Sequence, residues 1–394
     1  MLTLDTGAIL AATRHLQPVQ IRWRRHLHQH PEIANQEFET TAFLKKELRR
    51  LGLKILPLKL KTGVLAELKG GAPGLTVAIR SDIDALPVPE KTGLKFASKV
   101  DGRMHACGHD MHMAIVLGVA ALLAENRPAL RGRVRFIFQP AEEEPPGGAQ
   151  RMIAGGALNG VDTIFGLHVD PTIPVGKVGL RDGAMMAAVY DFDLVIRGRG
   201  GHAARPHLAV DAITTAAEVV ESLQKVVSRE TDPAEPIVLT IGTIHGGRAR
   251  NVVADEVRLC CTARSLSARQ GRKIPGIIRR LVAGVCRAHG ARFEIIEAPS
   301  YPILVNDPAT NALFGRVFEA LFGRGRVEPC DAVLGGEDFA FYLQRVPGAM
   351  LRLGIMNRRE RAREPWHSSR FVADERALYY GTALLTGSVL AYTG

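Results

Sequence analysis

Cysteine is scarce in this sequence: there are 5 among 394 residues, an odd number spread over the chain. Small secreted domains that depend on disulfides are far richer in cysteine, so this composition argues against a disulfide framework. The first residues also lack the basic stretch followed by an apolar stretch that marks a secretory signal. We therefore expect a cytoplasmic protein.

Long apolar runs and aromatic side chains are also scarce. No apolar run reaches the ~18 residues that a membrane-spanning helix needs. Aromatic residues make up 6% of the chain, so few rings are available to stack on nucleic-acid bases. The formal net charge is +11, but the basic residues are dispersed, which indicates a solvated arginine-rich surface or attraction of an acidic substrate. We expect neither a membrane nor nucleic acid as a partner.

The chain is longer than the ~250–300 residues at which single hydrophobic cores stop growing, so we expect two domains. Residues 1–184 and 299–394 alternate apolar strands with amphipathic helices, which is typical of a mostly parallel sheet. Residues 185–298 follow the order β-α-β-β-α-β, the ferredoxin-like arrangement. The predicted fold class is α/β, with the ferredoxin-like domain inserted into the parallel-sheet domain.

Apolar periodicity places the individual elements. Helices are expected at 38–51, 111–124, 148–157, 210–228 and 268–289, and from about 374 onward. Strands are expected at 63–69, 75–79, 133–138, 163–167, 190–196, 237–244, 252–264 and 292–296. Polar clusters follow three of the strands, at 81–84, at 142–144 and at His168. In open α/β sheets the functional site lies outside the carboxyl ends of the strands, so we expect it there.

The segment 105–112 (HACGHDMH) holds three of the 13 histidines, a cysteine and an aspartate. Imidazole, thiolate and carboxylate groups bind zinc, manganese and related metals. Cys107 and His109 are two residues apart, so both side chains can point the same way on an extended or turning segment. Asp110 stands where the N-cap of the following helix belongs. The alternative is a histidine-rich surface turn with a buried structural cysteine.

Three consecutive glutamates, 142–144, follow an apolar strand. Neighbouring residues on an extended segment face opposite sides, so one of Glu142 and Glu143 can bind metal while the other acts as general base. An isolated acidic triplet is more often a solvated loop. His367 taken alone fits a loop histidine, and His202 fits a histidine in a glycine-rich turn.

Seven short motifs occur in a fixed order along nearly the whole chain. They are RSDIDALP at 80–87, HACGHDMH at 105–112, FQPAEE at 138–143, GGHAARPH at 200–207, NVV at 251–253, GEDF at 336–339 and WHS at 366–368. Together they resemble the amidohydrolase branch of the aminoacylase/carboxypeptidase metallopeptidase superfamily. That branch includes hippurate hydrolases, indole-acetyl-amino-acid hydrolases and N-acyl-L-amino acid amidohydrolases.

The resemblance implies a catalytic domain with two divalent metal ions per subunit and Glu142 as the general base. The metal ligands carried over position by position are Cys107, His109, Glu143, His168 and His367. Cys107 favours zinc, whereas a site of histidine and carboxylate otherwise suits manganese, cobalt or nickel. Asp82 matches a catalytic-site carboxylate. In other members of the superfamily this carboxylate orients a metal-binding histidine that stands two residues before it. Here that position is Arg80, which cannot bind a cation, so Asp82 can instead brace Arg80 or a ligand.

The resemblance also assigns roles to the inserted domain, as a lid and dimerisation domain. His202 matches a histidine that reaches into the partner subunit's site as a donor to the oxyanion. Asn251 matches a lid residue associated with the substrate carboxylate, and Arg250 beside it can share that charge. The implied assembly is a homodimer, with a tetramer as the alternative.

The implied reaction cleaves the amide bond of an N-acyl L-amino acid to a carboxylate and a free amino acid. The acyl group can be acetyl, benzoyl or aryl-acyl. Three alternatives stay open: a metallo-carboxypeptidase or dipeptidase acting on short peptides, an amidase with Cys107 as nucleophile, and a non-enzymatic binding protein.

Overall fold

The computed structural model describes residues 5–359 and 362–394. Residues 1–4, part of the start that lacks a secretory pattern, lie outside the described residues. The chain divides into two compact units. The first consists of Met1–Gly183, Val305–Asp331 and Asp338–Gly394, and the second of Ala184–Leu304 and Ala332–Glu337. The second unit thus includes 332–337, which the sequence analysis placed with the first.

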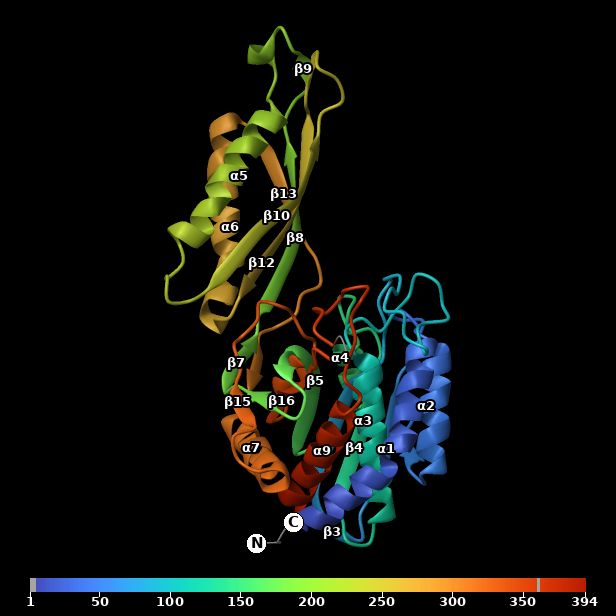
Figure 1. Cartoon of the computed structure of the whole chain (residues 1–394). Coiled ribbons are helices and arrows are strands. Elements are labelled where there is room, and N and C mark those ends of the chain that lie inside the picture. The colour runs from blue at the N-terminus through green and yellow to red at the C-terminus, as the bar shows by residue number, and fades with distance from the viewer. Residues whose placement is uncertain (1–4, 360–361) are drawn as a thin grey trace. The chain divides into compact units, whose positions relative to one another are not determined.

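An eight-stranded sheet lies at the centre of the first unit, in the order β1-β2-β4-β3-β5-β16-β6-β15 (Figure 1). The central strands β4, β3, β5 and β16 are parallel to one another, and β15 is parallel to β6. The remaining joins are antiparallel. The strands are β1 (Lys54–Ile55), β2 (Val64–Lys69), β3 (Ala72–Asp82), β4 (Arg131–Gln139), β5 (Thr163–Pro174), β6 (Val178–Leu180), β15 (Val327–Pro329) and β16 (Gly348–Met356). The predicted α/β class with a mostly parallel sheet is confirmed.

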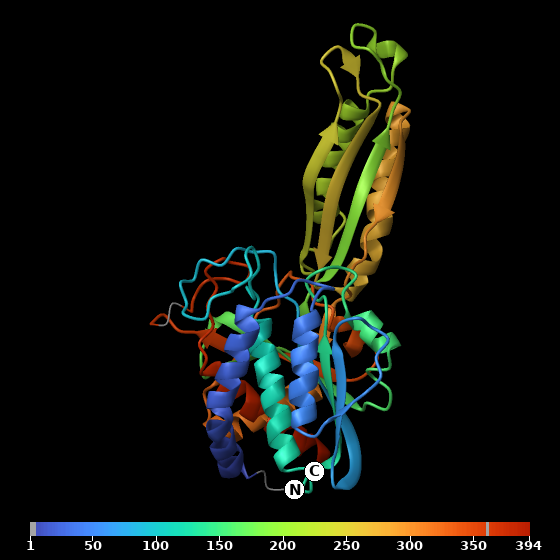
Figure 2. The ribbon, with the colours of Figure 1, turned by 90° about the vertical axis from the view of Figure 1, so that its right-hand side faces the viewer.

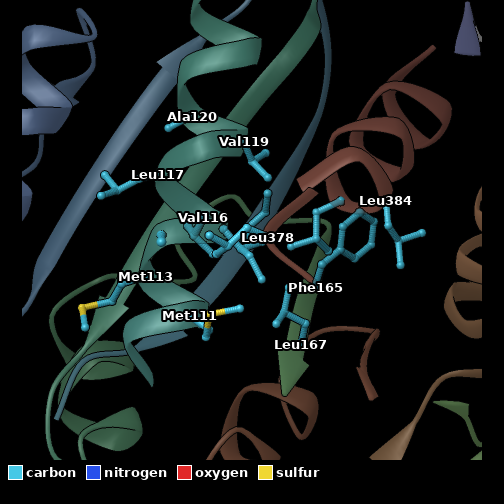
Figure 3. Packing of buried hydrophobic residues seen from close by; sticks show 14 of the residues in the cluster. Met111, Met113, Val116, Leu117, Val119, Ala120, Phe165, Leu167, Leu378 and Leu384 are labelled. Atoms are coloured by element: carbon cyan, nitrogen blue, oxygen red, sulfur yellow. The ribbon is translucent and has the colours of Figure 1, made fainter. Parts of the chain in front are cut away.

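Helices α1 (Thr6–Gln29), α3 (His109–Glu125) and α9 (Ala377–Thr393) pack against one another beside this sheet (Figure 1). After its polar first turn, α3 is apolar on every side, and its residues from His109 to Leu123 are all buried. Figure 3 shows Val116 and Val119 of α3 in one cluster with Phe165 of β5 and Leu378 of α9. Truncating one such large side chain to alanine typically costs about 2–5 kcal/mol, so this packing stabilises the position of α3.

Helix α1 was not predicted from the sequence, because its buried face carries polar side chains. Thr13, Gln20, Arg24 and His28 are buried among apolar neighbours. Gln20 Nε2 donates to the Ala114 carbonyl at 3.2 Å and to Thr382 Oγ1 at 2.6 Å. Polar residues are normally expected on the exposed face of a helix, so the apolar periodicity of the sequence does not indicate this helix.

The second unit has a four-stranded antiparallel sheet in the order β10-β12-β8-β13. With helices α5 and α6 packed on one face (Figure 2), its chain order is β8-α5-β10-β12-α6-β13, which confirms the ferredoxin-like arrangement. The elements are β8 (Ala188–Arg197), α5 (Ala212–Ser228), β10 (Ile237–Gly246), β12 (Glu256–Ser265), α6 (Ala268–His289) and β13 (Arg292–Glu297).

The shorter elements are α2 (Phe38–Arg50), α4 (Ala149–Ala154), α7 (Pro308–Phe322), α8 (Ala340–Leu343), β7 (Gly183–Met186), β9 (Gly201–His202), a 3₁₀ turn (Pro206–Leu208), β11 (Val252–Val253) and β14 (Leu304–Asn306). None of the helices in residues 5–359 and 362–394 combines the length and the hydropathy needed to span a bilayer.

Candidate metal centre

The carboxyl ends of β3 and β4 lie next to each other, because the strands pair in parallel with Asp82 opposite Gln139. Residues 83–84 therefore leave the sheet beside residues 140–144, where the polar clusters place the site. The expectation that His168 ends its strand is wrong. Strand β5 continues to Pro174 because it keeps pairing with β16, and His168 lies opposite Arg352 within that pairing.

Cys107 and His109 flank a glycine whose backbone favours glycine alone. Gly108 has a φ of 90°, and a Cβ there would lie 2.4 Å from Val169 Cγ2, so any side chain would collide. The turn brings Cys107 Sγ to 3.4 Å from His168 Nε2. One ligand atom from each of Cys107, His109 and His168 lies within 4.8 Å of the other two. The glycine therefore allows the thiol and both imidazoles to converge.

The hydrogen bonds of His109 and His168 each use Nδ1 and leave Nε2 of the ring facing the site. His109 Nδ1 donates to the Asp84 carbonyl at 2.8 Å, and His168 Nδ1 donates to the Val169 carbonyl at 2.8 Å. His109 Nε2 is buried and makes no hydrogen bond with any residue in the described ranges. A backbone acceptor on one ring nitrogen fixes the tautomer that offers the other nitrogen to a metal.

A second group of ligand atoms within 4.8 Å of one another comes from Cys107, Glu143 and His367. His367 Nε2 lies 3.3 Å from Glu143 Oε1. The His367 N–H donates to the Ala106 carbonyl at 2.9 Å, and the residue has a φ of 64°. A non-glycine residue rarely adopts that conformation, and such strain occurs preferentially at functional sites.

Trp366 fastens the same loop to β5. Its Nε1 donates to the Val169 carbonyl at 3.0 Å, and its ring meets the His168 ring edge-on with centroids 5.5 Å apart. No periodicity in the sequence indicates the position of this loop. Its position beside β5 depends on these contacts between residues far apart in the chain.

Glu142 is buried and contributes, with Glu143 and a histidine of α3, to a third group of close ligand atoms. Two buried carboxylates hold its loop. Glu37 Oε1 accepts from the Ala141 N–H at 2.8 Å, and Asp84 Oδ2 accepts from the Glu143 N–H at 3.0 Å. Glu37 was not predicted from the sequence, because it lies 104 positions from its partner and carries no motif of its own.

Asp82 is fully buried and engages several neighbours. Its Oδ2 accepts from Arg80 Nη1 at 2.7 Å and lies 3.7 Å from His109 Nε2, while its Oδ1 accepts from His112 Nδ1 at 2.7 Å. His112 Nε2 in turn accepts from the Val169 N–H at 3.0 Å. Both ring nitrogens of His112 are thus occupied, and Asp82 contacts the arginine that stands at the superfamily's histidine position.

The carboxylates of this region control the protonation of its other groups. Burial alone would lower the pKa of His109, but Asp82 and Asp84, helped by Glu143, outweigh it and raise that pKa to about 10. Burial raises the pKa of the Cys107 thiol well above its usual range, and nearby glutamates raise it further. A cysteine nucleophile needs a lowered pKa. The surroundings of Cys107 therefore disfavour the cysteine-nucleophile alternative.

Asp110 does not cap α3, contrary to the sequence-based expectation. The helix begins at His109, and the N-cap is Gly108, which has no side chain to accept a hydrogen bond. Asp110 Oδ2 instead accepts from Arg24 Nε at 2.7 Å and from His28 Nδ1 at 2.9 Å. This buried ion pair ties the first turn of α3 to α1.

In the second unit, His202, Arg250 and Asn251 are exposed and lie on adjoining segments. The Ala203 N–H donates to the Asn251 carbonyl at 3.1 Å. His202 Nδ1 accepts from the Ala204 N–H at 3.0 Å, so Nε2 carries the proton in the neutral ring. The exposed imidazole can therefore act as a hydrogen-bond donor.

The donor atoms fit divalent metal ions. All five predicted ligands fall in the three overlapping groups. The buried Glu143 Oε1 lies 3.3 Å from His367 Nε2 and 3.8 Å from His109 Nε2, and His109 Nε2 is buried without a hydrogen bond to any residue that the structure describes. Buried polar atoms are normally satisfied, and thiolate, imidazole and carboxylate ligands suit zinc and neighbouring transition metals. Which residues bind metal stays a prediction.

Comparison with known proteins shows that the chain is similar to known enzymes. The sequence profile described as "Peptidase family M20/M25/M40" matches residues 78–391. The chain is 41% identical over 360 residues to the N-acetylcysteine deacetylase of Bacillus subtilis, covering 91% of this chain and 92% of the relative. It is 44% identical over 286 residues to the N-acyl-L-amino acid amidohydrolase of Geobacillus stearothermophilus, covering 73% and 77%.

A solved structure is similar over nearly the whole chain. It is the YxeP protein of Bacillus subtilis, described as a dinuclear metal-binding peptidase of the M20 family. The TM-score is 0.85 at 36% identity, covering 96% of this chain and 98% of that one. The matched region includes both units described above.

Proposed function

The chain belongs to peptidase family M20/M25/M40 and is a hydrolase of that family, and on this premise we propose that it hydrolyses N-acyl L-amino acids. The products are a carboxylate and a free amino acid, and the acyl group is acetyl, benzoyl or aryl-acyl. The observation that supports this most is the convergence of five ligand side chains in overlapping groups, one of which includes the buried Glu142.

We propose Cys107, His109, Glu143, His168 and His367 as the ligands of two divalent ions. When bound, the ions lower the pKa of water and polarise the substrate carbonyl. Glu142 takes a proton from the attacking water as its oxygen bonds to the carbonyl carbon. The same carboxyl then gives the proton to the amide nitrogen as the C–N bond breaks. Asp82 keeps Arg80 and His112 in place.

The second unit supplies the remaining groups in this proposal. It acts as lid and dimerisation domain of a homodimer, in which the partner subunit's His202 donates to the oxyanion. Asn251, with Arg250, binds the substrate carboxylate. The exposure of all three residues and the Nε2 proton of His202 support this assignment.

Glu142→Gln tests the assigned base, with Glu144→Gln as the matched control because Glu144 is exposed on the same loop. Metal content is measured by elemental analysis, with zinc, manganese, cobalt and nickel each supplied. Hydrolysis is measured on N-acetyl, N-benzoyl and indole-acetyl amino acids and on a dipeptide. We expect E142Q to retain metal and lose about 10²–10⁴-fold in kcat, and E144Q to match the wild type. Wild-type turnover by E142Q would contradict the assignment, and preference for the dipeptide would favour a peptidase.

A further inference from the structure

Arg352 is a buried arginine beside the candidate metal centre. It lies on β16 opposite His168 of β5 and is 4% exposed. Paired residues on neighbouring strands project to the same face of a sheet. The Arg352 guanidinium lies over the Trp366 ring, with Cζ 5.2 Å from the ring centroid, and the same ring contacts His168. The cation therefore shares one aromatic neighbour with a proposed metal ligand.

No carboxylate in the described part of the chain pairs with this guanidinium. Within residues 5–359 and 362–394, the Arg352 side chain makes neither a hydrogen bond nor an ion pair, although guanidinium offers five N–H donors. Asp170 lies two positions beyond His168 on the same face, but its Oδ1 accepts from the N–H and hydroxyl of Thr172. The stacking on Trp366 compensates the charge only in part.

The other buried arginines of the described chain behave differently. Arg24 pairs with Asp110, Arg80 with Asp82 and with Asp338, and Arg135 with Glu67, all at 2.7–2.9 Å. A buried charge without a partner is costly, so buried cations are normally paired. Arg352 departs from this pattern at the edge of the proposed reaction site. An unpaired buried cation there indicates that its anion arrives with a ligand.

We propose that Arg352 binds a carboxylate of the substrate and so determines specificity for acidic substrates. The inference rests on the proposed function, because it takes the substrate to be an N-acyl amino acid. A guanidinium fork matches a carboxylate with two parallel hydrogen bonds. The carboxylate is either the α-carboxylate of the amino acid, which Asn251 and Arg250 are also proposed to bind, or a second one on its side chain.

Three compounds distinguish these two sources. N-acetyl-L-glutamate carries both carboxylates, N-acetyl-L-glutamine only the α-carboxylate, and the α-amide of N-acetyl-L-glutamate only the side-chain one. Binding is followed by the fluorescence of Trp366 in the metal-loaded E142Q protein, in which turnover is blocked. The chain has two tryptophans, so Trp23→Phe leaves Trp366 as the sole reporter.

We expect Arg352→Met to weaken binding on the order of 10- to 100-fold for every compound that carries the recognised carboxylate. The compound without it should bind equally to both proteins, which identifies the source. Arg352→Lys keeps the charge and should recover part of the affinity. In the active protein the same variants should raise KM more than they lower kcat.

Equal affinities of the proteins with and without the R352M substitution for all three compounds would overturn the proposal, as would no binding of any compound. A loss of thermal stability in R352M with an equal loss for all compounds would show a merely structural role. We expect instead that R352M unfolds at the same temperature or higher, because the substitution removes an unpaired buried charge. The proposed function fails separately, if these compounds bind but the wild-type protein hydrolyses no N-acyl amino acid.

Discussion

Replacing Asp110 with asparagine should destabilise the first unit, because the aspartate neutralises the charge of the buried Arg24. Asp110 and Arg24 are each 1% exposed, and the Nε–Oδ2 distance is 2.7 Å. His28 donates to the same oxygen at 2.9 Å. Asparagine preserves the size of the side chain but removes its charge. The variant therefore leaves the buried guanidinium without its principal partner.

The structure sets the expected magnitude. Removing one partner of a buried ion pair typically costs about 3–5 kcal/mol. Arg24 keeps a second carboxylate, since its Nη1 lies 3.3 Å from Glu375 Oε1. That partner is more exposed and farther away, so it compensates only partly. We expect Asp110→Asn to lower the free energy of unfolding by about 3 kcal/mol, the lower end of the range.

The loss should also depend on pH, through His28. Burial alone would lower the pKa of His28, but Asp110 and Glu90 raise it above its ordinary value. A histidine with a raised folded-state pKa adds stability that is complete below about pH 6.5 and is lost as pH rises through the folded pKa. Asp110 has a lowered pKa, despite burial, and stays charged at both pH values compared here. The loss in D110N should therefore be larger at about pH 6 than at about pH 9.

Denaturant titration followed by tryptophan fluorescence measures this loss. Trp23 and Trp366 are the two tryptophans and both belong to the first unit, so the signal reports the unfolding of that unit. A chelator in the buffer keeps metal binding from contributing to stability. Asp101→Asn is the control, because Asp101 is exposed, and it should change stability by less than about 0.5 kcal/mol. A D110N loss below about 1 kcal/mol, or an equal loss at both pH values, would refute the reasoning.

Three further outcomes test the site. Exhaustive treatment with a chelator should abolish hydrolysis and added metal should restore it, whereas activity that survives metal removal would favour Cys107 as a nucleophile. An equal mixture of His202→Ala and Glu142→Gln chains should recover roughly a quarter of wild-type activity if His202 acts across subunits, because half of the dimers are then mixed and each has one complete site. No recovery after confirmed mixing would contradict that. Trp366→Phe removes the N–H that donates to Val169 and should weaken metal binding about 10-fold or more, as measured by competition with a chelator. Unchanged metal affinity would show that the hydrogen bond from Trp366 to Val169 is not needed for metal binding.

Much of the fold could be predicted because the relevant information is local. Helix α6 was expected at 268–289 and runs from Ala268 to His289, since apolar residues recur along one face. Helix α1 could not be found this way, because Gln20 and Arg24 are buried polar residues with distant partners. The same limit applies to His168, whose strand continues because β16 pairs with it.

For the candidate site, the sequence alone determined which residue types stand in which motifs, and that was enough to indicate metal-dependent amide hydrolysis. The spacing of residues within a motif is informative because local features, such as the turn at Gly108 and the ends of the strands, fix the directions of the neighbouring side chains. The tertiary structure decided the partners: Asp110 pairs with Arg24 rather than capping α3, and His112 is occupied by Asp82. It alone showed that Arg352 is buried with no carboxylate partner among the residues that the structure describes. Whether a buried charge is paired depends on contacts between residues far apart in the chain, and a local sequence pattern contains no information about such contacts.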